Sequence, residues 1–422
     1  RQQVHFMKNA IISLLCAITI ISHSCIGKGE GPNDFKEFNL AEIVTEVKLA
    51  MVKEEGSVVL PTNCIVYNTK LMLSDLFTEI DAVPLESSEG SLIGGIDKLL
   101  FCDSTLLVVD KYKTKSIKQF TKGGGFVGLI GSNGRGPGQY YEPTDCVVYK
   151  DNIIVYDQFQ QKIIFFGNRG DLIKEQKVPF TFNSFFVFDN NNLLFQMYDN
   201  DNQHINEILG YSLIWCDSLF NIQHKSLYKE KDKYNNMINS GLTLGLDKVY
   251  FHPPYSDSIY QIEEKGVIKL EYLLEVQLPL PDELLLRKNG EQLSKMSYET
   301  PNNYMLFTGI PYISKNKVLY EISFNRRVQY VFFQRDLQKC LAGDLVINDL
   351  SHLTSGLGKP IYAGLDYLIT YEHAYRIKET METYKKYGLD AKDLLNEKEQ
   401  IIAEKLKDYS NPVLFFYHYK EE

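Results

Sequence analysis

A glycine-rich loop from Gly131 to Tyr140 contains the side chains best suited to contact a ligand. It reads GSNGRGPGQY, and Arg135 is its only charged residue. Glycine permits positive φ and a close approach of the backbone to a ligand. A planar guanidinium group suits a carboxylate or a sulfate. The alternative interpretation is a tight crossover between structural elements, with Arg135 paired to a neighbouring acid.

Aromatic side chains near this loop, and at one later position, could stack on sugar rings. Tyr140 and Tyr141 end the loop, and Tyr255 follows a pair of prolines. Each ring offers a flat apolar face, and the hydroxyl adds a polar contact. His252, directly before the prolines, could be a ligand contact or a base, although a single histidine more often has a structural role. The candidate ligand-binding residues are therefore Arg135, Tyr140, Tyr141, His252 and Tyr255.

Other polar clusters match no catalytic or metal-binding motif. The segment Asp199–His204 has the oxygen-rich composition that calcium prefers, but an EF-hand loop needs Gly at its sixth position and Glu at its twelfth, where this chain has His204 and Gly210. HExxH, GxSxG and the phosphate-binding Gly-Lys-Ser/Thr sequence do not occur. We predict no catalytic residues and no resident cofactor, with calcium as the alternative.

Short apolar strands joined by tight turns must position these candidates. The pattern predicts strands at Cys146–Tyr149, Ile153–Tyr156 and Lys162–Phe166, with Asp157 closing the second. The same pattern occurs upstream, where Asp110 closes a strand 47 residues earlier (157 minus 110). We interpret both aspartates as turn caps that accept backbone N–H groups.

Six such units follow one another along the chain, which predicts an all-β, six-bladed β-propeller. Residues 374–408 have helical composition and predict a helical hairpin inserted before a last strand at Val413–Tyr419. Because a ring of blades must close, Thr78–Leu85 is expected to pair with that last strand. The predicted propeller spans residues 76–422, after a linker and packing segment at residues 26–75.

The N-terminal residues resemble a bacterial lipoprotein signal. From Met7, a short basic region precedes the apolar run Ala10–Ile21, which is too short to span a bilayer. Ser24 before Cys25 resembles the cleavage site at which the cysteine is acylated. We predict that residues 1–25 are a signal segment cleaved before Cys25, which becomes the lipidated residue. A plain secreted protein and an uncleaved anchor are the alternatives.

The net charge and the cysteine content indicate which partners and which cysteine states to expect. Residues 1–24 contain Arg1 and Lys8 and no acid, so their removal takes the net charge from −9 to about −11. This charge disfavours nucleic acid as a partner. Five widely spaced cysteines remain without a CxxC motif, and we interpret them mainly as buried thiols, with one disulfide as an alternative. They are Cys64, Cys102, Cys146, Cys216 and Cys340.

Two resemblances support the fold. The stretch Gly128–Glu175 resembles the NHL repeat. Together with the lipoprotein signal, the Gly134–Tyr140 loop, the late helices and the ending Asn411–Tyr417, it makes the chain similar to six-bladed β-propeller lipoproteins of Bacteroidales-type bacteria. The resemblance implies the fold and a location in the bacterial cell envelope, lipid-anchored at the outer membrane and facing either the periplasm or the surface. It implies no catalytic residues.

Three functions fit this sequence. The favoured hypothesis is a non-catalytic binding or scaffolding lipoprotein for glycans, another small molecule or an envelope protein partner, held to the membrane through Cys25. The second is an enzyme, either a calcium-dependent lactonase or esterase or a glycan-active propeller, which requires carboxylates from several blades to converge. The third is a purely structural role. The ligand, the membrane face, the oligomeric state and the disulfide state stay open at this point.

Overall fold

The computed structural model describes residues 35–420, except 55, 66–68, 198–201, 229–240, 289, 301–302 and 308. The chain divides into two units, residues 1–39 and residues 40–422. In the first, only the end is described, including the short helix η2 (Phe35–Glu37). The predicted signal segment and Cys25 lie outside the described residues. No described helix is both long enough and apolar enough to cross a membrane.

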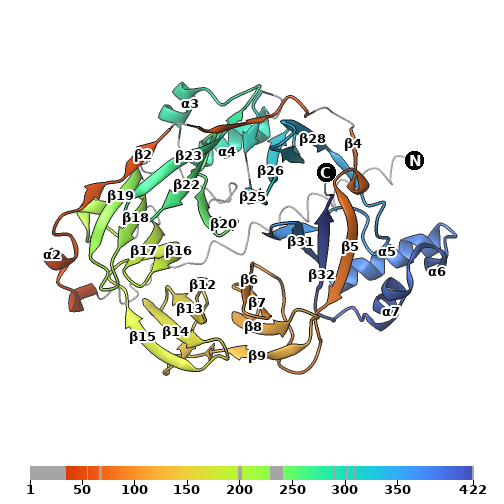
Figure 1. Ribbon diagram of the computed structural model, residues 1–422, viewed down its shortest axis with the longest axis horizontal. Helices are drawn as coiled ribbons and strands as arrows, with labels where there is room; N and C mark the ends of the chain where they lie inside the picture. Colours follow the sequence, from red (N-terminus) through yellow and green to blue (C-terminus); the bar gives the residue numbers. More distant parts are fainter. Residues whose placement is uncertain are drawn as a thin grey trace. The chain divides into compact units, whose positions relative to one another are not determined.

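The second unit is a ring of six blades (Figure 1). Each blade is built on antiparallel strands, and successive strands lie progressively farther from the centre of the ring. The first blade contains β6 (Lys98–Cys102), β7 (Thr105–Asp110), β8 (Ser116–Thr121) and β9 (Phe126–Ile130). The second contains β12 (Asp145–Tyr149), β13 (Asn152–Asp157), β14 (Lys162–Gly167) and β15 (Leu172–Lys177). The third contains β16 (Phe182–Asp189), β17 (Asn192–Met197), β18 (Tyr211–Cys216) and β19 (Ile222–Tyr228).

The other three blades complete the ring. The fourth contains β20 (Leu242–Gly245), β21 (Lys248–Phe251), β22 (Ser258–Glu263) and β23 (Val267–Glu275). In the fifth, β24 (Leu306–Phe307) and β25 (Tyr312–Ile313) both pair with β26 (Lys317–Phe324), followed by β27 (Arg327–Gln334) and β28 (Lys339–Gly343). The sixth contains β30 (Lys359–Ala363), β31 (Tyr367–Glu372), β32 (Val413–Tyr419) and β5 (Phe77–Pro84). The predicted six-bladed fold is confirmed.

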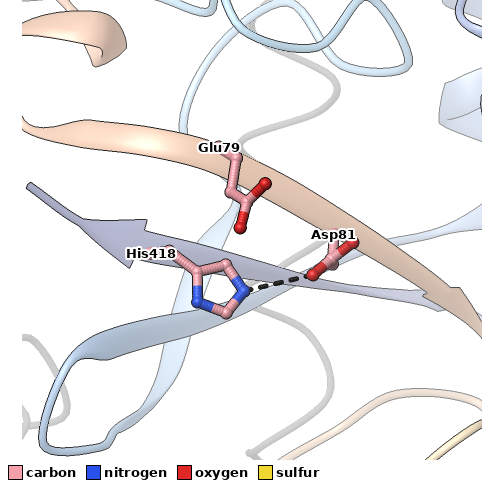
Figure 2. A group of neighbouring side chains, drawn as sticks. All are labelled: Glu79, Asp81 and His418. Atoms are coloured by element: carbon pink, nitrogen blue, oxygen red, sulfur yellow. Dashed lines mark hydrogen bonds and ion pairs between the residues drawn. The ribbon is translucent and has the colours of Figure 1, made fainter.

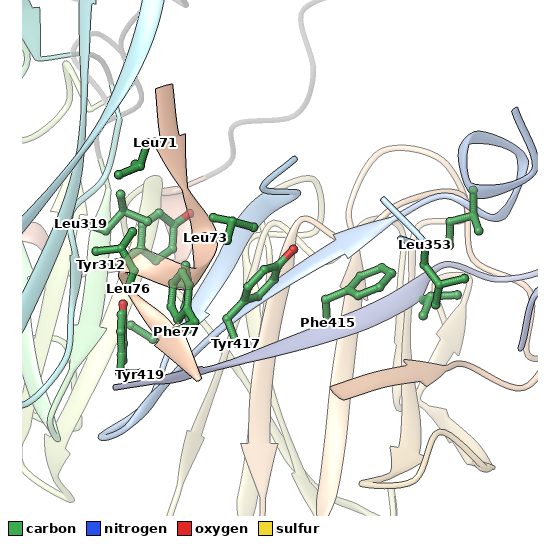
Figure 3. Close-up of a cluster of buried hydrophobic side chains, with 14 of the residues drawn as sticks. Leu71, Leu73, Leu76, Phe77, Tyr312, Leu319, Leu353, Phe415, Tyr417 and Tyr419 are labelled. Carbon is green, nitrogen blue, oxygen red and sulfur yellow. The ribbon is translucent and has the colours of Figure 1, made fainter. Parts of the chain in front are cut away.

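The expected ring closure is confirmed by the pairing of β5 with β32. The two strands are antiparallel and their register runs from Val413 opposite Pro84 to Tyr419 opposite Phe77. Buried aromatic side chains from both strands pack together beneath this pairing (Figure 3). The helices α5 (Ala374–Lys386), α6 (Ala391–Leu394) and α7 (Glu397–Lys405) lie between β31 and β32. The other short helices are α2 (Leu40–Ile43), η3 (Leu73–Asp75), η4 (Asn206–Ile208), α3 (Asp282–Arg287) and α4 (Gly290–Glu299).

The middle strands are apolar on both faces because each blade is sandwiched between two others. The strand β7 reads TLLVVD and β13 reads NIIVYD, and the last five residues of each are buried. The outer strand β15 (LIKEQK) is almost entirely exposed. A near-continuous apolar run is the pattern expected for a strand covered on both faces. The hydrophobic core therefore lies between the blades, as between the first and second blades.

A segment that we call the belt, the described residues of the range 48–84, runs along the outer edges of four blades (Figure 1, red to orange). Its strand β1 (Lys48–Leu49) pairs with β19, while β2 (Met51–Lys53) and β3 (Val58–Pro61) pair with β23. Next, β4 (Lys70–Met72) pairs with β29 (Leu345–Ile347), directly after the fifth blade, and β5 pairs with β32. The belt satisfies backbone groups that the outer strands would otherwise leave exposed at an edge.

A disulfide joins the belt to the fifth blade. Cys64 bonds to Cys340 in β28, with a sequence separation of 276 residues and Cα atoms 6.0 Å apart. Cys102, Cys146 and Cys216 are free and buried, in agreement with the interpretation of buried thiols. Burial raises the pKa of the Cys146 thiol to about 12, so this sulfur is protonated and unreactive.

Replacing Cys340 by serine is expected to lower the free energy of unfolding by about 2–4 kcal/mol, because the bond closes a very long loop of the unfolded chain. Chemical denaturation under non-reducing conditions measures this difference. The matched control is Cys216→Ser, which leaves the disulfide in place. A Cys340→Ser variant as stable as the parent protein would contradict a stabilising role for the bond.

Candidate functional site

Loops from all blades gather at one end of the ring, which we call the loop face. In the second blade Asp145, the first residue of β12, lies opposite Tyr156, near the end of β13. The loop that enters β12 and the loop that leaves β13 therefore emerge together. In a propeller each blade repeats this arrangement. The loop face thus carries residues 111–115, 131–144, 158–161 and 252–257, as well as the helices between β31 and β32.

The glycine-rich loop folds back on itself. Its strands β10 (Ser132–Asn133) and β11 (Gln139–Tyr140) pair in parallel, and the Gly136 amide donates to the Gln139 side chain at 2.8 Å. Gly134 has a φ of +150°, and a Cβ there would lie 2.2 Å from Oε1 of Gln139. The glycines thus serve the packing of the loop. Arg135 is exposed and forms no ion pair within the part of the chain that the structure describes.

Tyr140 is a core residue and its ring is not available to a ligand. It is 1% exposed, its hydroxyl donates to the Ile130 carbonyl at 2.8 Å, and it accepts from the Ile117 amide at 3.0 Å. Burial raises its pKa well above the ordinary value. This position departs from the expected stacking role because Tyr140 faces inward from β11, while the next residue faces solvent.

Three exposed aromatic residues on neighbouring loops form what we call the aromatic platform: Tyr112, Tyr141 and Phe159. Their exposed fractions are 67%, 42% and 64%. The rings of Tyr141 and Phe159 lie 5.2 Å apart, and Nζ of Lys115 lies 4.9 Å from the Tyr141 ring centroid. An ion pair of 2.9 Å between Lys115 and Glu142 joins the loop of Tyr112 to that of Tyr141. The three residues therefore expose aromatic rings on loops of two adjacent blades.

Two buried aspartates fix the loops of the platform. Asp157 accepts from the amides of Phe159 at 2.9 Å and Tyr141 at 2.6 Å. Asp110 accepts from the amides of Lys113 at 2.9 Å and Gly94 at 2.7 Å. The interpretation of both aspartates as turn caps is confirmed. Because the bonds reach the backbone beside the rings, the platform is held in place before any ligand arrives.

Sequence reasoning identified Tyr141 but missed Tyr112 and Phe159. A signal was present, because each of these two follows its capping aspartate by two residues, and they are 47 positions apart (159 minus 112), as the aspartates are. An aromatic residue recurring at the same turn position in adjacent blades places two rings on one face. A comparison of the repeats at the level of turns would have found both.

A charged cluster lies where β6 and β12, the first strands of the first and second blades, begin. Asp145 is 1% exposed, and its carboxylate lies 2.8 Å from Nζ of Lys98 and 3.8 Å from Nζ of Lys111. It also accepts from the amide of Phe185, in the third blade, at 3.1 Å. Burial lowers the pKa of Lys111. The cluster thus links three blades, and its carboxylate is already bound by protein donors.

The remaining predicted contacts do not join the platform. His252 is 1% exposed, its Nε2 lies 2.8 Å from the Ser256 carbonyl, and its ring packs against Phe307 at 4.0 Å. Tyr255 is half-buried with a positive φ of 58°. Both residues lie on the loop of the fourth blade, so they share the loop face with Tyr141 without forming one cluster with it. His252 acts as a structural residue.

Helix α5 begins beside another small aromatic group on the loop face. The rings of Tyr371 and Tyr375 each lie 5.5 Å from the ring of His373. Burial, with the nearby cation of Lys113, lowers the pKa of His373. Lys113 belongs to the loop of Tyr112, and of the three rings in this group only Tyr375 is exposed.

The described residues contain one group with metal-ligand geometry, and it lies away from the loop face. Glu79 and Asp81 on β5 and His418 on β32 have donor atoms within 4.8 Å of one another, and Asp81 lies 3.2 Å from Nε2 of His418 (Figure 2). The two acids are exposed.

The oxygen-rich segment Asp199–His204 is described only in part, because residues 199–201 lie outside the described residues. Buried Asn202 and half-buried His204 bond to the backbone of Thr181 and Pro179.

This protein is a six-bladed β-propeller whose ring is closed by a strand from the N-terminal side. One end of the ring carries exposed aromatic side chains. More particularly, the chain belongs to the family "Domain of unknown function (DUF4934)", whose model matches residues 57–418.

A solved structure shares the fold, and two others resemble it more weakly. A "Putative exported protein" from Bacteroides fragilis has a TM-score of 0.68 and 17% identity, over 86% of this chain and 99% of its own. A DUF4221 family member from Bacteroides vulgatus has a TM-score of 0.48 and 11% identity, over 82% of this chain and 97% of its own. Virginiamycin B lyase from Staphylococcus aureus has a TM-score of 0.37 and 12% identity, over 69% and 80%. No curated protein matches the sequence.

Proposed function

We propose that this protein is a lipid-anchored propeller of the bacterial cell envelope that binds glycans without catalysis, and that the aromatic platform is the main contact surface. The observation that carries the proposal is the placement of Tyr112, Tyr141 and Phe159 on two adjacent blades, exposed yet held by buried aspartates. Flat rings in fixed positions can stack on the apolar faces of successive sugar rings. Ordering them beforehand reduces the entropy lost on binding.

Polar side chains around the platform suit the hydroxyl and acidic groups of a glycan. Lys115 and Glu142 lie beside Tyr141, and exposed Arg135 belongs to the preceding loop. A guanidinium in this position would recognise a sulfate or a uronate carboxylate with paired hydrogen bonds. The proposed ligand is therefore a glycan that carries acidic groups. Tyr140 and His252 have no part in it, because both are buried.

The envelope location is supported by the disulfide between Cys64 and Cys340, since such bonds persist in oxidising compartments outside the cytosol. The relative from Bacteroides fragilis is named as exported, which agrees with this proposal. Acylation of Cys25 would attach the propeller to the membrane through the segment before the belt. A non-catalytic role is favoured because Asp145, a buried carboxylate at the inner end of a first strand, is neutralised by two lysines.

The test is a glycan-binding screen of residues 26–422, followed by titration calorimetry with the best ligand. Each of Tyr112→Ala, Tyr141→Ala and Phe159→Ala is expected to weaken binding about tenfold, and the triple variant at least about a hundredfold. Tyr387→Ala is the matched control, because Tyr387 is 74% exposed on the helical insertion. Folding is monitored by thermal melting.

Two results would contradict the proposal. One is equal glycan affinity in the triple variant and the parent protein. The other is stabilisation by calcium, reversed by a chelator and accompanied by ester or lactone hydrolysis, which would favour the enzyme instead. At a ligand concentration of a hundred times the dissociation constant, binding adds about 2.7 kcal/mol of stability, so either ligand should raise the melting temperature measurably.

A further inference from the structure

A pocket opens between the second and third blades at the end opposite the loop face. Its volume is about 310 Å³, and its walls come from Ile154, Ile163 and Phe165 on one side and Phe185, Val187 and Leu193 on the other. Tyr149 and Asn152, which also line it, lie at the far end of β12 and β13 from Asp145. The pocket is therefore separate from the aromatic platform.

The size and lining of this pocket are those of a ligand site. Protein interiors are close-packed, and voids larger than a water molecule are few. This space has room for several waters, but the apolar side chains of its walls offer those waters few hydrogen bonds. A concave, mostly apolar pocket with a few polar groups is typical of small-molecule sites. An apolar ligand body would complete the packing between the two blades.

The polar groups at the mouth indicate the charge of the ligand. Lys174 lines the pocket, and its Nζ lies 4.4 Å from the ring centroid of Phe165, a wall residue. Within the described part of the chain, Lys174 forms no ion pair. It therefore supplies an uncompensated positive charge where a ligand would enter.

The other charged group at the mouth, Asp189, is already engaged. Its carboxylate accepts from the amide of Asn191 at 2.6 Å and from Nδ2 of Asn192 at 2.6 Å. These bonds hold its pKa below the ordinary value, so it stays ionised within its own turn. A ligand with a cationic head would have to compete with both asparagines for this carboxylate.

We propose that this pocket binds a small monocarboxylate with an unbranched apolar tail, the tail lying between the second and third blades and the carboxylate meeting Lys174. The proposal does not depend on the glycan site. It assigns the two ends of the propeller to ligands of opposite character, one polar and extended, the other apolar and compact.

Titration calorimetry on the purified chain tests the proposal with octanoate, hexanoate, 1-octanol and octylamine. Octanoate is expected to bind with a stoichiometry of one. Hexanoate is expected to bind about 15-fold more weakly, because each buried methylene contributes about a factor of four. Octylamine is expected to bind more weakly than octanoate. Equal affinity for octanoate and hexanoate, or tighter binding of octylamine, would overturn the proposal.

Two variants locate the bound molecule. Val187→Phe fills the space between the blades and is expected to abolish octanoate binding. Lys174→Met keeps the length of the side chain but removes the charge, and is expected to weaken octanoate about fivefold while leaving 1-octanol unchanged. Lys122→Met, on an exposed turn of the first blade, is the matched control.

Lys174→Met also tests the proposal if Val187→Phe fails to fold, since Lys174 is at the surface. Undetectable octanoate binding by the parent protein at millimolar concentration would refute the site. So would full octanoate affinity in a folded Val187→Phe protein, or equal octanoate affinity in the parent protein and Lys174→Met.

Discussion

Replacing Phe77 by alanine is expected to lower the free energy of unfolding by about 3–5 kcal/mol. Phe77 begins the closing strand β5 and is fully buried. Its ring lies 5.0 Å from that of Tyr419 and 5.2 Å from that of Tyr417 (Figure 3). The ring of Phe332, in the fifth blade, lies 6.0 Å away. Truncation therefore removes the aromatic contacts that hold the closing strand β5 onto β32. It also leaves a cavity between the fifth and sixth blades.

Equilibrium denaturation followed by circular dichroism measures this loss. Val59→Ala provides the control, since Val59 belongs to the same belt but is 45% exposed, and surface substitutions usually change stability by less than about 0.5 kcal/mol. A loss below about 1 kcal/mol for Phe77→Ala would contradict the importance of these ring contacts for closure.

Replacing Asp145 by asparagine is expected to cost about 3 kcal/mol of stability, the low end for breaking a buried ion pair. The change keeps the shape and an acceptor for the Phe185 amide, but it leaves the cations of Lys98 and Lys111 facing each other without an anion. Their side chains are 24% and 20% exposed, so water screens part of the repulsion. Since this cluster joins three blades, we expect the inner ring to loosen.

Comparing the free energies of unfolding of Asp145→Asn and Asp81→Asn distinguishes the contribution of a buried ion pair from that of an exposed one. Asp81 meets His418 on the outer face of the sixth blade, where its side chain is 53% exposed (Figure 2). Exposed pairs contribute about 0–1 kcal/mol, so little change is expected there. Equal effects of the two substitutions would show that the inner cluster is not a structural centre.

The blades were predictable because their signal is local. Alternating or continuous apolar runs of four to six residues, bounded by turn residues, repeat along the chain. The first four strands of the belt were not predictable, since β1, β2, β3 and β4 contain only two to four residues each. Their partners are distant, as with Lys48 opposite His224. The pairing of Cys64 with Cys340 was open for the same reason.

The candidate site was only partly predictable. Neighbouring residues on a strand point to opposite faces, so Tyr140 and Tyr141 could not be separated without knowing which face of β11 is buried. An aromatic residue in one turn, such as Phe159, gives no signal within its own blade, and only its recurrence 47 residues after Tyr112 marks the position. The pocket near Lys174 depends on how side chains of two blades meet, which no pattern within one blade reveals.

The belt and its disulfide have a mechanical consequence. Tension applied at the N-terminal side of residue 48 would first load the parallel strands β1, β2 and β3 in shear against the third and fourth blades. At Cys64 the covalent bond would transfer the force into β28 of the fifth blade. The closing strand β5 lies beyond that point along the chain. A propeller tethered at its N-terminal end would therefore withstand pulling without having its ring unzipped.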